Sequence, residues 1–86
     1  MNFPVSIKGV LVEAGGVALL ENEREEWELP GGRLEPGEAP KTCLVREFAE
    51  ELGVVVEVAG IIDCWLFEVL PQREVVIVTY GVKRCG

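Results

Sequence analysis

The sequence predicts an α/β fold in which a mixed β-sheet carries one helix on one face. β-branched, apolar stretches lie on both sides of a short segment with helical spacing, and a glycine turn introduces that segment. The 86 residues are 49% hydrophobic, which excludes a disordered chain and leaves room for one domain. We therefore expect a single domain over residues 1–86.

Two strands are predicted before the helix. Residues 6–13 and 16–21 are joined through Ala14-Gly15-Gly16, and a glycine pair suits a tight hairpin turn. Residues 22–26 are mostly charged and are expected to form a loop.

The helix is predicted from about Pro40 to Leu52. Pro40 suits the first turn, where its missing N–H is not needed, and Gly53 offers a left-handed stop. At about 100° per residue, the apolar side chains fall on one arc and three carboxylates fall on another. The apolar arc holds Leu44, Val45, Phe48, Ala49 and Leu52, and the acidic arc holds Glu47, Glu50 and Glu51.

Three apolar stretches follow the helix. Residues 54–60, 61–70 and 74–82 are rich in β-branched side chains and are predicted as strands, with a break at Pro71-Gln72. Residues 75–80, VVIVTY, are expected to form an interior strand covered on both faces.

The acidic arc is electrostatically unfavourable for an isolated helix. Glu47 and Glu51 are like charges at i,i+4, which costs about 0.2–0.5 kcal/mol. A carboxylate near the helix C-terminus faces its negative end and costs about 0.3–1 kcal/mol. A solvated helix face is one interpretation. A hard divalent cation such as Mg²⁺ is the other, because it prefers oxygen ligands, whereas the absence of histidine argues against the usual zinc sites.

Residues 32–54 resemble the Nudix box. The shared positions are Gly32, Glu38, Arg46, Glu47, Glu50, Glu51 and Gly53, with apolar residues at 48 and 54. The preceding segment Trp27-Glu28-Leu29-Pro30-Gly31-Gly32 is similar to the usual lead-in of this family. Because so many fixed positions agree, the resemblance outweighs the interpretation as a solvated face.

The resemblance implies a hydrolase that cleaves the pyrophosphate linkage of nucleoside diphosphate derivatives with Mg²⁺ or Mn²⁺. It implies Glu50 and Glu51 as principal metal ligands, and Glu47 as a further ligand or as the base that activates water. The carbonyl of Gly31 or Gly32 would add a metal contact. Arg46 would orient the adjacent glutamate, and Glu38, Gly32 and Gly53 would give structural support.

The chemistry implied by this family needs no covalent nucleophile. Bound cations would clamp the phosphate oxygens and lower the pKa of a water that Glu47 could deprotonate. The three cysteines have no histidine partner and Ser6 is the only serine, so composition excludes a nucleophilic triad.

Substrate contacts are less well defined by the sequence. Trp27 and Trp65 could stack on a base. Among scattered cations that could contact a phosphate, Arg33 lies closest to the glycine turn; the others are Lys8, Arg24, Arg46 and Arg73.

Charge and composition restrict partners and location. The net charge of −7 disfavours a long nucleic acid, and no apolar run is long enough to cross a membrane. Three cysteines without C-x-x-C spacing and a start that lacks the features of a secretory signal indicate the cytoplasm.

The chain is short for the family it resembles. By this resemblance we expect the usual C-terminal helix to be missing, which would leave an apolar sheet face open unless the chain is a fragment of a longer one. We therefore expect a homodimer or strand-exchanged oligomer, formed by sheet stacking, edge pairing or strand exchange. A shortened domain that binds nucleotide or metal, or serves in assembly, without useful catalysis is the alternative to a hydrolase.

Overall fold

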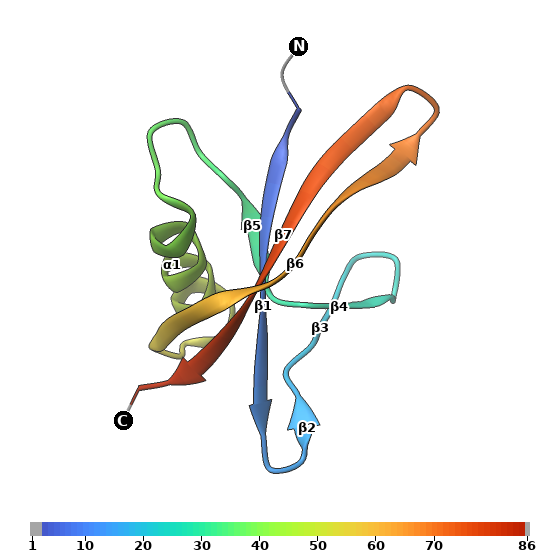
Figure 1. Ribbon diagram of the computed structural model, residues 1–86. Helices are drawn as coiled ribbons and strands as arrows, with labels where there is room; N and C mark the ends of the chain where they lie inside the picture. Colours follow the sequence, from blue (N-terminus) through green and yellow to red (C-terminus); the bar gives the residue numbers. More distant parts are fainter. Residues whose placement is uncertain (1–2, 86) are drawn as a thin grey trace.

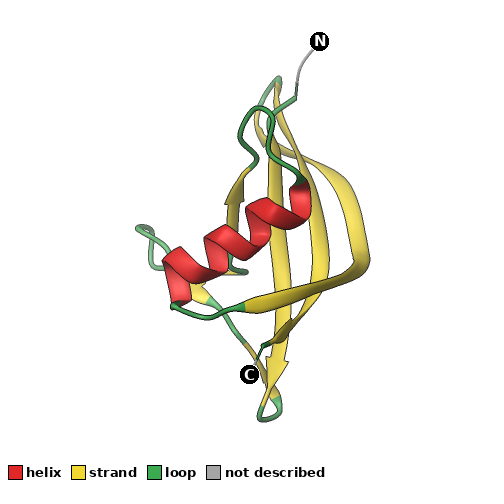
Figure 2. Ribbon diagram, turned by 90° about the vertical axis from the view of Figure 1, so that its left-hand side faces the viewer, coloured by secondary structure: helices red, strands yellow, loops and turns green. Residues whose placement is uncertain are grey.

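The computed structural model describes residues 3–85 and shows a mixed β-sheet with one helix lying across one face (Figures 1 and 2). Residues 1, 2 and 86 of the expected domain lie outside this described part. The elements are β1 (Val5–Glu13), β2 (Gly16–Val17), β3 (Leu20–Glu21), β4 (Trp27–Glu28), β5 (Gly31–Arg33), α1 (Pro40–Leu52), β6 (Val56–Leu70) and β7 (Arg73–Arg84). The predicted fold class is confirmed.

Strand pairing makes the sheet mixed. Its order is β2-β1-β7-β6, and β5 also pairs with β1. β1 and β7 run parallel, whereas β6 is antiparallel to β7, and both β2 and β5 are antiparallel to β1. Residues 75–80 therefore form an interior strand, as predicted, although Val76, Ile77 and Val78 remain half-buried.

Two predicted strand boundaries are wrong. Residues 16–21 form two short strands because β2 pairs with β1, whereas β3 leaves that sheet and pairs with β4. Residues 54–60 and 61–70 form one strand because pairing with β7 continues past Gly60 through register shifts between Val58 and Asp63. The hairpin at Ala14-Gly15 is confirmed, with positive φ at both residues.

The core lies between α1 and the sheet. Ile7, Leu44 and Phe48 are fully buried. A Cβ at Gly9 would lie 2.6 Å from Cε1 of Phe48, so this glycine lets the ring rest against β1. The helix begins and ends as predicted, and Gly53 closes it at φ 66° with its N–H donating to the Ala49 carbonyl. Ala49 itself is exposed, so the packed arc is narrower than expected.

The sheet face opposite α1 carries exposed apolar side chains. Trp65 and Phe67 form a T-shaped pair with ring centroids 5.3 Å apart. Residues 59–70 of β6 are exposed throughout. No helix within residues 3–85 is both long and apolar enough to cross a bilayer.

Gly9→Ala should lower the free energy of unfolding by about 1–3 kcal/mol, because the new methyl group overpacks the Phe48 ring. Gly60→Ala is the matched control, since a Cβ there would meet no atom of residues 3–85 within 4 Å, and it should change stability by less than about 0.5 kcal/mol. Urea unfolding measures both. Equal stability of the two variants would contradict the packing described for α1.

Candidate functional site

The glycine pair of β5 lies against two carboxylates of α1. Gly31 has φ 143°, and a Cβ there would lie 1.9 Å from the Ile7 carbonyl oxygen, so only glycine permits this approach to β1. The Gly31 N–H donates to Oε1 of Glu51 at 2.9 Å. A Cβ at Gly32 would lie 2.5 Å from Oε1 of Glu47. Glu47 and Glu51 therefore both contact the turn that the sequence singled out.

Arg46 joins the acidic arc to the segment before the helix. Its Nε and Nη2 donate to the two carboxylate oxygens of Glu38 at 2.8 and 3.1 Å. Its Nη1 contacts Oε1 of Glu47 at 3.0 Å and Oε2 of Glu50 at 3.3 Å. A longer ion pair of 3.8 Å reaches Glu35. One guanidinium thus contacts the carboxylates of Glu35, Glu38, Glu47 and Glu50.

Glu51 differs from the other two carboxylates of the arc. Within residues 3–85 it makes no ion pair, and burial raises its pKa. The hydrogen bond from Gly31 opposes this rise, and so does the positive charge of Lys8. A cation beside Glu51 would therefore relieve an electrostatic cost that the Gly31 N–H and Lys8 compensate only in part.

The carboxylates are the right type of ligand for a divalent cation, but their side chains do not converge on one point in this structure. All the side-chain donors are oxygens, which suits Mg²⁺ or Mn²⁺. Among residues 3–85, however, no three acidic or cysteine side chains converge closely enough to hold a metal ion. Glu47 and Glu50 face Arg46, while Glu51 faces Gly31. Binding a cation would require Glu47 and Glu50 to give up part of their contact with Arg46.

Cys43 lies beneath this network and is not a reactive thiol. It is fully buried, and burial raises its pKa to about 11. The thiolate required for nucleophilic chemistry is therefore scarce at neutral pH.

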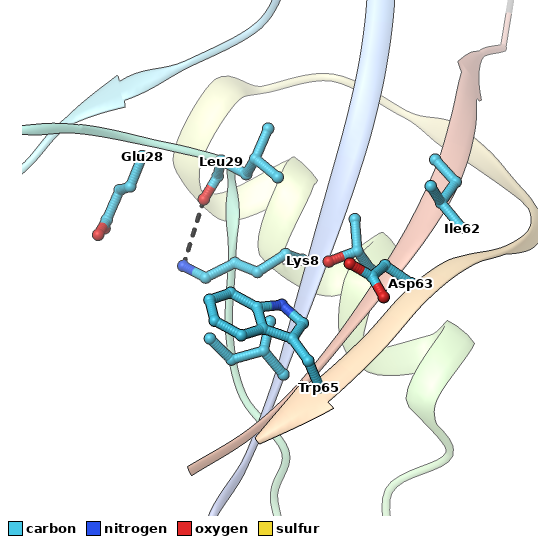
Figure 3. Close-up of a pocket in the computed structure, with 8 residues that line it drawn as sticks. Lys8, Glu28, Leu29, Ile62, Asp63 and Trp65 are labelled. Carbon is cyan, nitrogen blue, oxygen red and sulfur yellow. Dashed lines mark hydrogen bonds between the residues drawn. The ribbon is translucent and has the colours of Figure 1, made fainter. Parts of the chain in front are cut away.

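A cavity of about 480 Å³ opens on the sheet face opposite α1 (Figure 3). It is lined by Lys8, Glu28, Leu29, Ile62, Asp63, Trp65, Ile77 and Thr79. The register of the strands determines which side chains form the bottom of the cavity. Thr79 pairs with Lys8 on one side and with Asp63 on the other, so these three side chains form one polar row on a single face. Ile77 and Trp65 are also paired and supply the neighbouring apolar row.

The structure separates the predicted substrate residues. Trp65 is 45% exposed and lines this cavity, whereas Trp27 is 66% exposed on β4 and is not among the lining residues. Arg33 lines a different cavity, beside Leu70 and Arg73 at the end of the β6–β7 hairpin. Asp63 and Thr79 were not predicted, because only the register of β6 on β7 places them next to Lys8.

Comparison with known proteins gives a consistent result. The family model described as the NUDIX domain matches residues 3–84. A MutT-like protein of Streptomyces ambofaciens is 46% identical over 56 residues, which cover 63% of this chain and 36% of that protein. An 8-oxo-dGTP diphosphatase of Proteus vulgaris is 37% identical over 51 residues, covering 59% of this chain and 45% of that protein. Each match thus spans less than half of the relative.

A solved structure agrees with these matches. The crystal structure of the MutT protein from Methanosarcina mazei Go1 superimposes with a TM-score of 0.79 at 30% sequence identity. The superposition covers 92% of this chain and 62% of that protein. The arrangement of sheet and helix is therefore shared with a solved protein over nearly all of this chain.

The Glu38 carboxylate should remain ionised at pH 3.5, because the Arg46 guanidinium lowers its pKa to about 2. This pairing stabilises the fold above pH of about 4.5, and its contribution should disappear as the pH falls toward 2. In Arg46→Gln, the carboxyl should titrate near its ordinary value. Side-chain ¹³C shifts follow this titration.

Arg24→Gln is the control for that titration. Arg24 makes an exposed ion pair with Glu26 and should leave the Glu38 midpoint unchanged. A midpoint near 4.5 in the wild-type protein would contradict the Arg46 network.

Proposed function

The chain belongs to the Nudix family, and on this premise we propose that it hydrolyses the pyrophosphate linkage of nucleoside diphosphate derivatives with Mg²⁺ or Mn²⁺. The observation that carries the proposal is the contact of Glu47 and Glu51 with the glycine pair of β5. The proposed setting is the cytoplasm, and the proposed partner is a small nucleotide rather than a long nucleic acid, in keeping with the net charge of −7.

The proposed metal ligands are Glu47, Glu50 and Glu51, with the carbonyl of Gly31 as a further contact. When bound, a divalent cation would neutralise the diphosphate and make water more acidic. Glu51 is suited to hold it because burial raises the pKa of this carboxyl and so disfavours its bare anion. Hydrogen bonding to Gly31 keeps one Glu51 oxygen in place.

Arg46 has a proposed positioning role. It donates to Oε1 of Glu47 at 3.0 Å and is itself held by both oxygens of Glu38. This arrangement limits rotation of Glu47 while leaving its second oxygen able to turn toward a cation or to accept a proton from water. Glu47 is proposed as ligand or as base, and measured metal affinity of Glu47→Gln separates these two roles.

The cavity beside Trp65 is the proposed site for the nucleoside part of the substrate. Its volume of about 480 Å³ lies within the usual range for small-ligand sites. Trp65 and Ile77 offer apolar surface for a base. The similarity to an 8-oxo-dGTP diphosphatase makes oxidised and ordinary nucleoside triphosphates reasonable first substrates.

A binding or assembly module without useful turnover is the second candidate function. One observation favours it: Arg46 engages Glu47 and Glu50, the same carboxylates that would have to hold the metal.

We propose further that two copies pair through β6. This strand is an edge of the sheet over Val56–Leu70, and its apolar side chains outside the cavity, at 61, 66, 67, 69 and 70, are exposed. Sedimentation should show a dimer for the wild type and for Leu19→Lys, which changes an exposed residue outside this sheet, but a monomer for Leu66→Lys. A monomeric wild type would refute the pairing.

Hydrolysis should depend on Mg²⁺ or Mn²⁺, and Glu50→Gln and Glu51→Gln should each lower kcat by a factor on the order of a hundred. Phosphate release is to be measured with nucleoside triphosphates, 8-oxo-dGTP, ADP-ribose, NADH and dinucleoside polyphosphates. Glu57→Gln, which changes an exposed carboxylate on β6, is the matched control and should retain activity.

Two results would count against this proposal in different ways. If the wild type releases no phosphate from any of these compounds with either metal, the binding module becomes the better account. If both variants keep full activity, the hydrolase is correct but its site is misassigned.

A further inference from the structure

Lys8 lines the cavity beside Trp65 and pairs with the glycine that holds Glu51. Its backbone pairs with Gly31 in the β1–β5 register, and the Gly31 N–H donates to Glu51. Its side chain points to the face opposite that of Ile7 and lines the cavity together with Trp65 (Figure 3). This one residue therefore connects the two parts of the proposed site.

Lys8 supplies the positive charge of the cavity wall. The other charged residues of the lining are Glu28 and Asp63, which would repel an anion. The Lys8 Nζ donates to the Leu29 carbonyl at 3.2 Å. An ammonium group has three N–H donors, so two remain for another acceptor. A phosphate oxygen suits such a group because the hydrogen bond is charge-assisted.

The rest of the cavity suits the apolar and aromatic part of a nucleotide. Trp65 and Ile77 lie side by side in register, and Ile62 adds apolar lining on the far side of Asp63 (Figure 3). The edge contact with Phe67 supports the orientation of the Trp65 ring. Base stacking on an aromatic side chain tolerates any base, whereas the charge of Lys8 requires an anionic group.

We propose that Lys8 binds the phosphate adjacent to the nucleoside, and that it thereby decides which end of the substrate enters the cavity. This inference rests on the proposed function. With the nucleoside beside Trp65 and its phosphate on Lys8, the following phosphate is directed along β5 toward Gly31 and Glu51. The substrate class is therefore a nucleoside carrying a 5′-phosphate chain. Lys8 holds its first phosphate even when no metal is bound.

A purely structural role is the competing explanation for Lys8. In that case its bond to Leu29 only ties β1 to the segment between β4 and β5. Loss of the side chain would then lower stability and leave the discrimination between nucleotide and nucleoside unchanged. The two explanations are distinguished by comparing ligands that differ only in the phosphate.

The test measures binding without metal or turnover. The full chain in EDTA is titrated with the four common nucleosides and their 5′-monophosphates, and the Trp65 indole N–H signal is followed by NMR, with Trp27→Phe used for assignment. At least one monophosphate should bind the wild type about tenfold more tightly than its nucleoside. Lys8→Met should remove that preference and leave nucleoside affinity unchanged, and Lys8→Arg should restore it.

Lys83→Met is the matched control, because it removes the same charge from an exposed position near the end of β7. It should leave the phosphate preference within about twofold. If Lys8→Met does not fold by circular dichroism, Lys8→Gln takes its place, and Lys8→Arg keeps the comparison informative.

Three results would overturn the role of Lys8. They are an unchanged preference in Lys8→Met, an equal loss of affinity for nucleoside and nucleotide, and a Trp65 signal that no ligand shifts. Failure of the hydrolase proposal is separate: a phosphate preference that depends on Lys8, in a protein that hydrolyses nothing, would refute catalysis and retain this binding site.

Discussion

The close contact between the glycine pair of β5 and the acidic arc of α1 is the constraint on which the site depends. Gly31 can lie against Ile7 only because it lacks a side chain, and this approach places its N–H on Glu51. Gly32 leaves room for Glu47 in the same way. A larger residue at Gly31 would push β5 away from β1, and one at Gly32 would push against Glu47 of α1, so the two carboxylates would lose their common location.

The second constraint is that Arg46 and a bound cation would compete for the same carboxylates. Arg46 holds Glu38 by two hydrogen bonds and also reaches Glu47 and Glu50. These contacts offset part of the repulsion among the acidic side chains. They also mean that a cation must draw Glu47 and Glu50 partly away from Arg46, while Glu51 needs no such exchange.

The sequence predicted the local features well. Pro40 and Gly53 set the helix ends as expected, because helix caps depend on neighbouring residues. The sheet class followed from β-branched stretches, but the split of residues 16–21 into β2 and β3 depends on long-range pairing that composition does not contain. The exposure of Ala49 shows a similar limit. Helical spacing predicts which side chains share one face of the helix, but not how many of them the sheet buries.

The candidate site was predictable only where it is contiguous in sequence. Glu47, Glu50 and Glu51 belong to one helix, so their motif identified them. Lys8, Asp63 and Thr79 come from three strands, and their common row exists only after β1, β7 and β6 adopt their register. The same reason explains why Trp65 and Trp27, similar candidates in the sequence, differ once folded: one lines the cavity and the other does not.

Anomalous scattering from crystals of this chain soaked in Mn²⁺ would show directly whether the carboxylates of α1 and the β5 turn hold a metal ion. Manganese is expected beside Glu51 and the Gly31–Gly32 turn, with an oxygen of Glu47 and of Glu50 turned toward it and Arg46 retained by Glu38. Manganese bound elsewhere, or a saturating soak that leaves Glu47 and Glu50 on Arg46 and no ion at Glu51, would contradict this assignment.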